Sequence, residues 1–307
     1  MTIRVGTRGS KLAMAQTGHA AEQIERVSGE AVKLVPITTT GDTSSAPVTE
    51  LGVGVFVNQL RQALRDDEID VAVHSFKDLP TAQPDDLVIP AVPARQDPRD
   101  CLIASEGRTL DDLPPGSRIG TGSPRRMSQL RALDRGWEIV PIRGNIDSRS
   151  ARVGNDLDAV VLAAAGLRRV GRESDITQSI DPLTMLPAPA QGALALECRK
   201  ADKTNSAILY KLNDRYAHFA ATAERAVLAR LEAGCTAPVA ALADTSEADT
   251  DPEAVDLYLR ALVAAEDGSR IDRNSVTATV SSPEEAFALG TRLADELLDG
   301  GVADLLA

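Results

Sequence analysis

Arginines are concentrated in one short part of this sequence. Between Arg118 and Arg152 the chain carries eight arginines and only three acidic residues, although its formal net charge is −12. The planar guanidinium group donates several hydrogen bonds in a fixed geometry that suits carboxylate and phosphate groups. We therefore expect an anion-binding site, and the residue types alone leave both a polycarboxylate and a phosphate ligand open.

Four of these arginines are the best candidates because they follow predicted strands or begin predicted helices. They are Arg125, Arg126, Arg143 and Arg149. Functional side chains gather at the ends of strands in α/β proteins. Arg131 and Arg135 are instead expected on an exposed helix surface.

The segment HSFKDLP at 74–80 is a second candidate site, because it follows the apolar run IDVAV. Ser75, Lys77 and Asp78 would project from the carboxyl end of a strand. A neighbouring lysine and aspartate more often form an exposed ion pair of little energetic value. The residues alone therefore leave both interpretations of this pair open.

The three cysteines differ in their predicted surroundings. Cys235 follows a glycine that ends a helix and lies in a turn, whereas Cys101 and Cys198 lie in apolar strand-like runs. A turn cysteine can be reached by an electrophile, but an inert and partly buried thiol fits the sequence equally well. An odd cysteine count without a C-x-x-C pair favours a reducing compartment.

No metal site is expected, because the histidines lack the spacing of metal ligands and H-E-x-x-H is absent. The histidines are His19, His74 and His218. Nucleic-acid binding is also disfavoured, since the pI is near 4.8 and Trp137 is the only aromatic residue in the arginine segment. Nucleotide-binding glycine fingerprints are incomplete or absent.

The elements that position these residues belong to a soluble α/β protein. The 307 residues are 43% apolar and 25% charged, which allows sizeable cores and two or three domains. The first ten residues contain charges and no apolar signal-peptide core, and no run of about 18 uncharged apolar residues follows. We expect a cytoplasmic protein without a membrane segment.

Short β-branched runs alternate with helical periodicity through the first two-thirds of the chain. Strands are expected at 3–7, 32–38, 69–74, 117–121, 138–142 and 157–163, and helices at 11–27, 55–66, 124–134 and 146–154. This alternation predicts βαβ units and largely parallel sheet. Five prolines between 78 and 100 predict a break in helix and central strand, where a hinge between two domains could lie.

Two segments repeat the same order of features. VGTRGSKLA and IGTGSPRRM each give a strand, Gly-Thr, and a serine that opens a helix. Ser10 and Ser123 are therefore expected N-caps, with Pro124 in the first turn. The repeat indicates two similar domains whose helix N-termini offer backbone N–H groups to an anion.

A third, small α+β domain is expected at the C-terminus. The helix-like stretch from 217 ends at Gly234, and a strand-like run at 255–263 and a helix-like run at 283–298 follow. Residues 244–307 contain 15 acids and 4 arginines, a charge typical of a solvated surface.

Ten segments in order closely resemble the porphobilinogen deaminase family, also called hydroxymethylbilane synthase. They are TRGSKLA, LVPITTTGD, GVGVFVNQL, DVAVHSFKDLP, DPRDCL, IGTGSPRRMSQL, IRGNIDSR, VVLAAAGLRRVG, LPAPAQGALALECR and TAERAVLARLEAGCTAPV. They cover the chain to about residue 240, and the remainder resembles the family only loosely.

The resemblance implies an α/β fold with two type II periplasmic-binding-protein-like domains of mixed, mainly parallel sheet and a small α+β C-terminal domain. Residues 1–95 and 193–212 would form domain 1, 99–188 domain 2 and 214–307 domain 3. The active site would lie between the first two domains. The chain would return to domain 1 near ALALECR.

The resemblance also implies a transferase of porphyrin biosynthesis. Four porphobilinogen molecules would be joined stepwise, with loss of ammonia, to a dipyrromethane held on Cys235 by a thioether, and hydrolysis would release hydroxymethylbilane to the next tetrapyrrole enzyme. Asp78 is the implied catalytic residue, which stabilises positive charge in the pyrrole rings and shuttles protons. We expect a monomer with no nucleic-acid or membrane partner.

The carboxylates of substrate and cofactor explain the arginines under this resemblance. The implied cofactor-binding residues are Cys235, Lys77, Asp78, Ser123, Arg125, Arg126, Thr121 and Gly192. The implied substrate-binding residues are Arg8, Ser10, Arg143, Arg149, Arg169, Gln191 and Phe56. Val53 stands where the family commonly has lysine, which puts a lysine role there in doubt. The main alternative is a polycarboxylate-binding module without catalysis, which would not need the turn cysteine.

Overall fold

The computed structural model describes residues 2–38, 57–233, 237–249 and 251–306. They divide into two compact units. Unit 1 comprises Met1–Arg95 and Ala193–His218, and unit 2 comprises Gln96–Gly192 and Phe219–Ala307. No helix in the described part is both long and apolar enough to cross a membrane.

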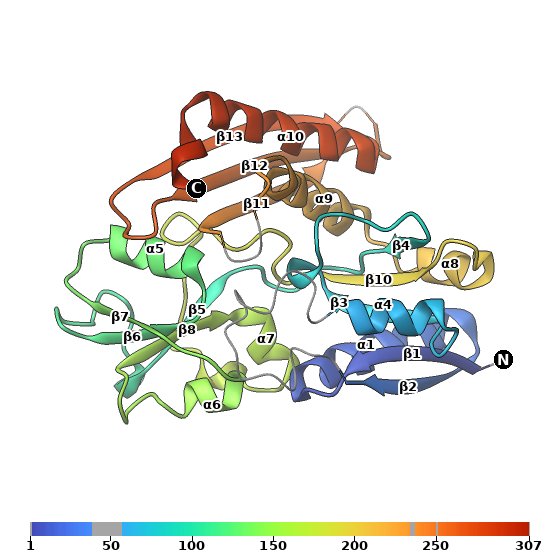
Figure 1. Cartoon of the computed structure of the whole chain (residues 1–307), viewed down its shortest axis with the longest axis horizontal. Coiled ribbons are helices and arrows are strands. Elements are labelled where there is room, and N and C mark those ends of the chain that lie inside the picture. The colour runs from blue at the N-terminus through green and yellow to red at the C-terminus, as the bar shows by residue number, and fades with distance from the viewer. Residues whose placement is uncertain (1, 39–56, 234–236, 250, 307) are drawn as a thin grey trace. The chain divides into compact units, whose positions relative to one another are not determined.

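Unit 1 is built on a five-stranded sheet in the order β2-β1-β3-β10-β4 (Figure 1). The strands are β1 (Thr2–Arg8), β2 (Ala31–Ile37), β3 (Val71–Ser75), β4 (Leu87–Ala91) and β10 (Leu194–Arg199). β1 pairs in parallel with β2 and β3, whereas β10 runs antiparallel to β3 and β4. The run ALALECR therefore does return to the first sheet.

Helices cover both faces of this sheet. They are α1 (Lys11–Ser28), α4 (Asn58–Arg65) and α8 (Lys203–Tyr210), and the short 3₁₀ turn η1 (Phe76–Asp78) follows β3. Ile3 and Val5 of β1 pack in one cluster with Ile24 of α1. On the other face a Cβ at Gly6 would lie 2.3 Å from Ile69 and 3.1 Å from Leu60, so α4 can approach β1 closely only because residue 6 is glycine.

Unit 2 contains a second five-stranded sheet in the order β7-β6-β8-β5-β9. The strands are β5 (Asp100–Ala104), β6 (Arg118–Thr121), β7 (Glu138–Pro141), β8 (Ala159–Ala163) and β9 (Gln178–Ser179). β6 is parallel to β7 and β8, and β5 is antiparallel to β8 and β9. Each sheet thus has three parallel strands, one antiparallel strand and an edge strand in the same order, so the expected repeat and the mixed, mainly parallel class are confirmed.

Helices also cover both faces of the second sheet. They are α5 (Pro124–Ala132), α6 (Ile146–Ser150) and α7 (Ala164–Arg169), with short 3₁₀ turns η2 (Ser105–Gly107) and η3 (Glu173–Asp175). Leu130 of α5 packs with Ile119 and the only tryptophan, Trp137. Leu167 of α7 packs with Val160 on the opposite side.

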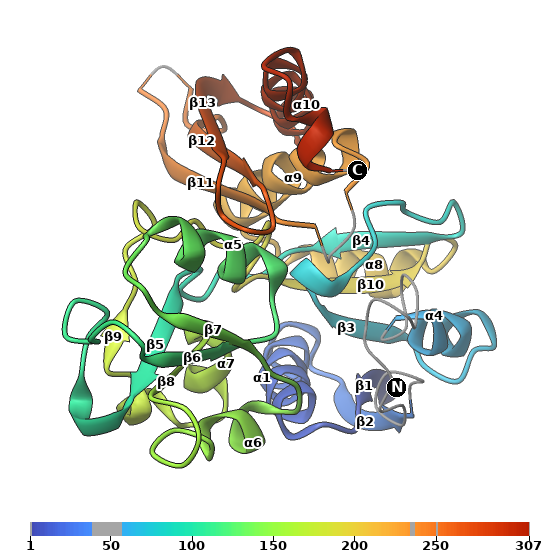
Figure 2. The ribbon, with the colours of Figure 1, turned by 60° about the vertical axis from the view of Figure 1, so that its left-hand side comes forward.

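The C-terminal part of unit 2 is a three-stranded antiparallel sheet with helices on one face (Figure 2). Its elements are β11 (Val239–Glu247), β12 (Val255–Ala264), β13 (Ile271–Val280), α10 (Pro283–Asp299), the 3₁₀ turn η4 (Val302–Leu305) and α9 (Arg215–Arg230), which belongs to unit 2 from Phe219 onward. A Cβ at Gly290 would lie 2.1 Å from the Ala223 carbonyl oxygen, so glycine allows α10 to pack closely on α9. The expected α+β character of this part is confirmed.

Two expectations about element limits were wrong. α6 ends at Ser150, and turns occupy 151–156 with Gly154 at φ 80°. α9 ends at Arg230, before Glu232 adopts φ 51°. The proline segment contains strand β4, which was not predicted and includes Pro90; β4 is an edge strand rather than a central one, and a missing N–H donor is tolerated there.

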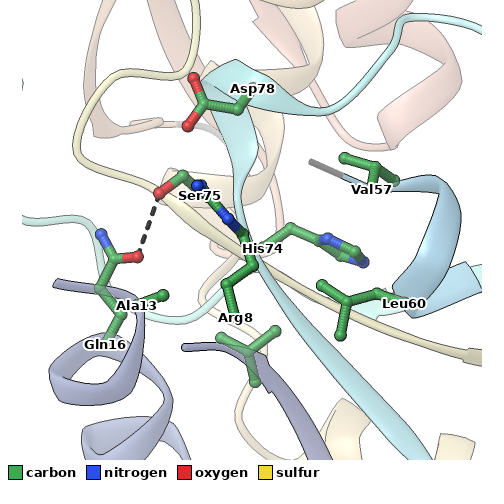
Figure 3. Close-up of a pocket in the computed structure, with 9 residues that line it drawn as sticks. Arg8, Ala13, Gln16, Val57, Leu60, His74, Ser75 and Asp78 are labelled. Carbon is green, nitrogen blue, oxygen red and sulfur yellow. Dashed lines mark hydrogen bonds between the residues drawn. The ribbon is translucent and has the colours of Figure 1, made fainter. Parts of the chain in front are cut away.

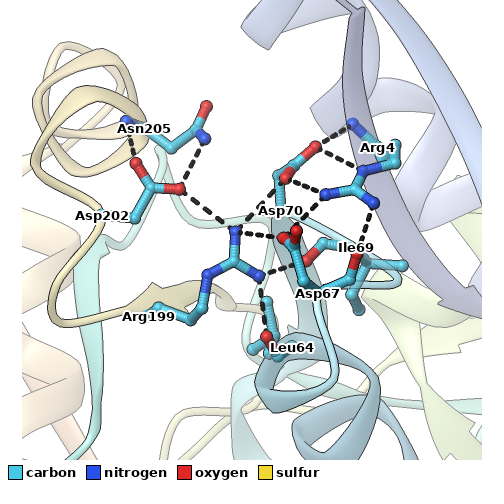
Figure 4. A network of polar contacts seen from close by, with 8 residues as sticks. All are labelled: Arg4, Leu64, Asp67, Ile69, Asp70, Arg199, Asp202 and Asn205. Atoms are coloured by element: carbon cyan, nitrogen blue, oxygen red, sulfur yellow. Dashed lines mark hydrogen bonds and ion pairs between the residues drawn. The ribbon is translucent and has the colours of Figure 1, made fainter.

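A network of hydrogen bonds and ion pairs joins β1 to Asp70, just before β3, and to the end of β10 (Figure 4). Arg4 donates from Nε and Nη2 to the carboxylate of Asp70 at 3.0 and 2.7 Å. Arg199 at the end of β10 contacts the same carboxylate at 3.3 Å and donates to the carbonyls of Leu64 and Ile69 at 2.7 Å. Burial raises the pKa of Asp70, but its bonds from Arg4 outweigh that effect and hold it below the usual 3.8.

Asp70→Asn is expected to destabilise the protein by about 1–3 kcal/mol at pH 7, because two arginines lose a charged acceptor. The lowered pKa means that the unfolded state binds the proton more readily. The contribution of Asp70 is therefore complete above about pH 5 and is lost as the pH falls through the folded-state pKa. Urea denaturation followed by circular dichroism should show the difference between wild type and variant shrinking from pH 6 towards pH 3. A pH-independent difference would contradict this account.

Candidate active site

A pocket in unit 1 lies beside the carboxyl ends of two parallel strands (Figure 3). Its polar lining includes Arg8 at the end of β1, Ser75 at the end of β3 and Asp78 in η1. Because β1 and β3 pair in parallel, their ends bring these side chains to one edge. The prediction that Ser75 and Asp78 project from a strand end is confirmed.

The same pocket has an apolar side and two polar residues that sequence reasoning missed. The apolar lining is Ala13, Val57, Leu60 and Val73. Gln16 of α1 accepts a hydrogen bond from the Ser75 hydroxyl at 3.1 Å, and His74 also lines the pocket. A flat, partly apolar ring that carries N–H and anionic groups would find complementary partners here. Nothing in the HSFKDLP segment predicts a contact with Gln16, because Gln16 belongs to α1.

Two further candidates in unit 1 lie near these strand ends but are not lining residues. Ser10 is the N-cap of α1, and its hydroxyl oxygen accepts from the Ala13 N–H at 3.3 Å. Lys77 lies in η1 beside Asp78 and is half-buried. The expected capping role of Ser10 is confirmed.

In unit 2, Thr121 and Ser123 belong to the second of the two similar segments, IGTGSPRRM, and lie at or just after the end of β6. Thr121 is buried, and its hydroxyl oxygen accepts from the Ser123 N–H at 3.3 Å. Ser123 is at the N-cap position of α5 with Pro124 in the first turn, but its side chain makes no capping hydrogen bond. The expected position of Ser123 is therefore correct, whereas the capping contact is absent.

Arg125 and Arg126 share one buried carboxylate. Arg125 Nη1 donates to Asp100 at 2.8 Å and to the Leu186 carbonyl at 2.6 Å, and Arg126 Nε donates to Asp100 at 3.0 Å. Gln191 Nε2 donates to the same carboxylate at 2.8 Å. Burial raises the pKa of Asp100, but the charges of the two arginines outweigh it and hold that pKa far below the usual range. Two arginines and one aspartate together carry one net positive charge. Sequence reasoning did not identify Asp100 as the partner of these arginines.

Some guanidinium nitrogens in unit 2 remain without partners. Within the described residues the Nε atoms of Arg125 and Arg149 are buried and make no hydrogen bond. Burial and the nearby charges of Arg126 and Arg143 lower the pKa of Arg149. Buried donors next to positive charge favour an anionic ligand. Arg149 and the exposed Arg143 therefore fit the expected carboxylate site.

Arg169 and Gly192 meet at the end of α7. Arg169 donates from Nη2 to the Gly192 carbonyl at 2.6 Å, and burial lowers its pKa to about 10. Gly192 has φ 88°, and a Cβ there would lie 2.3 Å from the Gln96 carbonyl oxygen. Glycine is therefore required by the close passage of two chain segments.

The other arginines of the 118–152 segment make ion pairs or hydrogen bonds at the surface of unit 2. Arg135 pairs with Asp111 at 3.1 Å, and Arg131 donates to the Glu266 carbonyl at 2.5 Å. Arg118 and Arg152 pair with exposed acids. Both Arg131 and Arg135 are exposed, as expected.

Cys235, Phe56 and Val53 lie outside the described residues. Cys101 and Cys198 are fully buried, and burial raises the pKa of each thiol to about 12. Neither can supply a thiolate near neutral pH. Searching the described ranges gives no cluster of three or more His, Cys, Asp or Glu that could hold a metal ion.

Residues 3–207 match the family described as "Porphobilinogen deaminase, dipyromethane cofactor binding domain", and residues 218–299 match its C-terminal domain. This chain belongs to the porphobilinogen deaminase family. A porphobilinogen deaminase of Nocardia farcinica is 52% identical over 99% of this chain and 88% of its own length. Another, from Mycobacterium avium, is 49% identical over 99% of this chain and 96% of its own length.

Solved structures with similar folds include substrate-binding proteins. An ABC transporter periplasmic substrate-binding protein of Coxiella burnetii has a TM-score of 0.44 at 14% identity, covering 70% of this chain and 93% of that one. The methionine-binding protein MetQ has a TM-score of 0.43 at 13% identity, covering 69% and 89%. The family, the dipyrromethane cofactor and the transferase class expected from the sequence are confirmed by the family and its relatives, and the mixed, mainly parallel sheets are those expected.

Proposed function

We propose that this chain acts as a hydroxymethylbilane synthase. It joins four porphobilinogen molecules to a dipyrromethane bound to Cys235, releases ammonia at each addition, and hydrolyses the product from the primer. The observation that carries this proposal is the pocket in which Arg8 and Asp78 lie beside an apolar wall, in a chain that matches the deaminase family over residues 3–207 and 218–299.

Asp78 is the proposed catalytic residue. As a carboxylate it can accept hydrogen bonds from pyrrole N–H groups and stabilise the positive charge that develops when ammonia leaves. Its oxygen can also take the proton that the terminal pyrrole of the bound chain loses from its α-carbon after the new carbon–carbon bond forms. The apolar wall formed by Val57 and Leu60 strengthens both effects, because electrostatic interactions are stronger away from water.

The unsatisfied arginines support the proposed cofactor. Carboxylates of a dipyrromethane would provide acceptors for the buried Nε atoms of Arg149 and Arg125, which have none within the described chain. When bound, the cofactor supplies the pyrrole carbon that the first substrate extends. Further residues assigned to cofactor are Lys77, Thr121, Ser123, Arg126 and Gly192, and those assigned to substrate are Arg8, Ser10, Phe56, Arg143, Arg169 and Gln191.

Cys235 is the proposed attachment point. Its support is the inaccessibility of Cys101 and Cys198, together with the match of the chain to a family that binds dipyrromethane. The proposal includes the three-domain division given above, a cytoplasmic monomer, and transfer of the product to the next tetrapyrrole enzyme.

Incubating the purified protein with porphobilinogen tests the proposed activity. The expected result is one ammonia released per porphobilinogen consumed, with a linear tetrapyrrole as product. Folded protein that binds porphobilinogen without releasing ammonia would contradict the enzyme and favour a carboxylate-binding module.

A further inference from the structure

Three buried polar side chains, linked by hydrogen bonds, connect α4 and β10 to the unit 1 pocket. Arg61 of α4 donates to Glu197 of β10 from Nε at 3.1 Å and from Nη2 at 2.8 Å. The other oxygen of Glu197 lies 3.1 Å from Nε2 of His74, which lines the pocket. The exposed fractions of these side chains are 6% for Arg61, 0% for Glu197 and 3% for His74.

The strand register explains why these residues meet. In the antiparallel pair of β10 and β3, Ala195 is opposite His74 and Glu197 is opposite Ala72. Alternate residues of a strand face the same side, so His74 and Glu197 both lie on the face that α4 covers. Gln83 donates to Glu197 at 3.0 Å and completes its set of donors.

The hydrogen bonds among Arg61, Glu197 and His74 determine which ring nitrogen of His74 carries a hydrogen. Burial raises the pKa of Glu197, but hydrogen bonds from His74 and Arg61 outweigh it and lower that pKa to about 2. An ionised carboxylate only accepts, so Nε2 of His74 must carry a hydrogen. Arg61 pairs with the charge of Glu197, so the Nε2–H of His74 is needed there only as a hydrogen-bond donor.

The second ring nitrogen, Nδ1, is not engaged by Glu197. Nδ1 of His74 has no hydrogen-bond partner within the described part of the chain. In the Nε2–H tautomer Nδ1 holds a lone pair and acts as an acceptor. Figure 3 shows the imidazole beside Val57 and Leu60, on the side of the pocket away from Gln16.

We propose that Arg61 and Glu197 hold His74 in the Nε2–H tautomer, so that Nδ1 accepts a hydrogen bond from a pyrrole N–H of the substrate or growing chain. His74 is then a substrate-binding residue, and Arg61 and Glu197 are positioning residues that act through it. The identity of the ligand in this inference rests on the proposed function. Asp78 and His74 together give the pocket two acceptors for pyrrole N–H groups.

The tautomer can be measured by ¹⁵N NMR of the histidine-labelled holoprotein, which contains only three histidines. His218 is an internal reference, because its Nδ1 lies 2.9 Å from Asn213 Oδ1, an oxygen that also accepts from the Val92 N–H. It should therefore show the opposite, Nδ1–H tautomer. The expected result for His74 is a protonated Nε2 and an unprotonated Nδ1, and an Nδ1–H tautomer there would overturn the inference.

Two substitutions of His74 test the roles of its two ring nitrogens separately. In His74→Gln the amide nitrogen can reach the Nε2 position and keep the contact with Glu197, while the Nδ1 acceptor is lost. In His74→Asn the amide lies near the Nδ1 position and the contact with Glu197 is lost. We expect His74→Gln to keep the wild-type urea midpoint but to lose about tenfold in kcat/KM, mainly through KM. His74→Asn should show the lower urea midpoint and the smaller change in KM.

The outcomes distinguish this inference from the function on which it rests. Wild-type protein that releases no ammonia from porphobilinogen would remove the proposed function and the inference with it. Active wild type beside a His74→Gln variant with unchanged kcat and KM would overturn the inference alone. Glu197→Gln is a further check: its amide can donate to Nε2, so the ¹⁵N signature of His74 should change to Nδ1–H.

Discussion

Asp78→Asn is expected to lower the turnover of porphobilinogen by at least about a hundredfold, because the substitution removes the charge that stabilises the cationic pyrrole. The side chain keeps its size and one oxygen acceptor, so the fold and the attached cofactor should persist. Ammonia release measures turnover, and intact-protein mass shows whether the cofactor remains.

Asp85→Asn provides the matched control for this prediction. Asp85 is exposed in the same unit and undergoes the same change of charge. It should retain wild-type turnover. An Asp78→Asn variant that carries the cofactor and turns over at the wild-type rate would remove Asp78 from the mechanism.

Asp100→Asn is expected to destabilise unit 2 by about 3–5 kcal/mol, because Arg125 and Arg126 would be left buried without a counter-charge. The side chain of Asp100 is 0% exposed, and those of the arginines are 4% and 6% exposed. Trp137 is the only tryptophan and packs on the core of the same unit, so its fluorescence reports urea unfolding there.

The control for that measurement is an exposed ion pair of the same unit. Asp111 pairs with Arg135 on the surface, and Asp111→Asn should change the free energy of unfolding by less than about 1 kcal/mol. Equal effects of the Asp100 and Asp111 substitutions would show that the buried triad is not the source of stability assigned to it.

Local pattern was sufficient to predict much of the fold. The alternation of β-branched runs and helical periodicity located the parallel strands, and the repeated order of strand, Gly-Thr and helix-opening serine predicted two similar domains. The antiparallel strands were harder, because pairing of β5 or β10 is decided by distant partners rather than by local periodicity. β4 was not predicted because Pro90 argues against a central strand, whereas a strand at the edge of a sheet needs fewer donors.

Part of the unit 1 pocket was predictable in the same way. Ser75 and Asp78 follow an apolar run, so their place at a strand end is visible in the sequence, whereas Arg8 was named only through the family resemblance. Asp100 was missed as the partner of Arg125 and Arg126, which follow it by 25 and 26 residues. Arg61 and Glu197 are 136 residues apart, and nothing in either segment predicts their contact. Such pairs arise from tertiary packing, which a single sequence pattern does not encode.

Denaturing intact-protein mass spectrometry of wild type beside Cys235→Ser tests whether Cys235 carries a covalent dipyrromethane. We expect wild type to carry added mass equal to two porphobilinogen-derived pyrroles and the variant to have only its sequence mass. Wild type from a tetrapyrrole-making host that shows only its sequence mass, and forms no adduct when porphobilinogen is added, would contradict the claim.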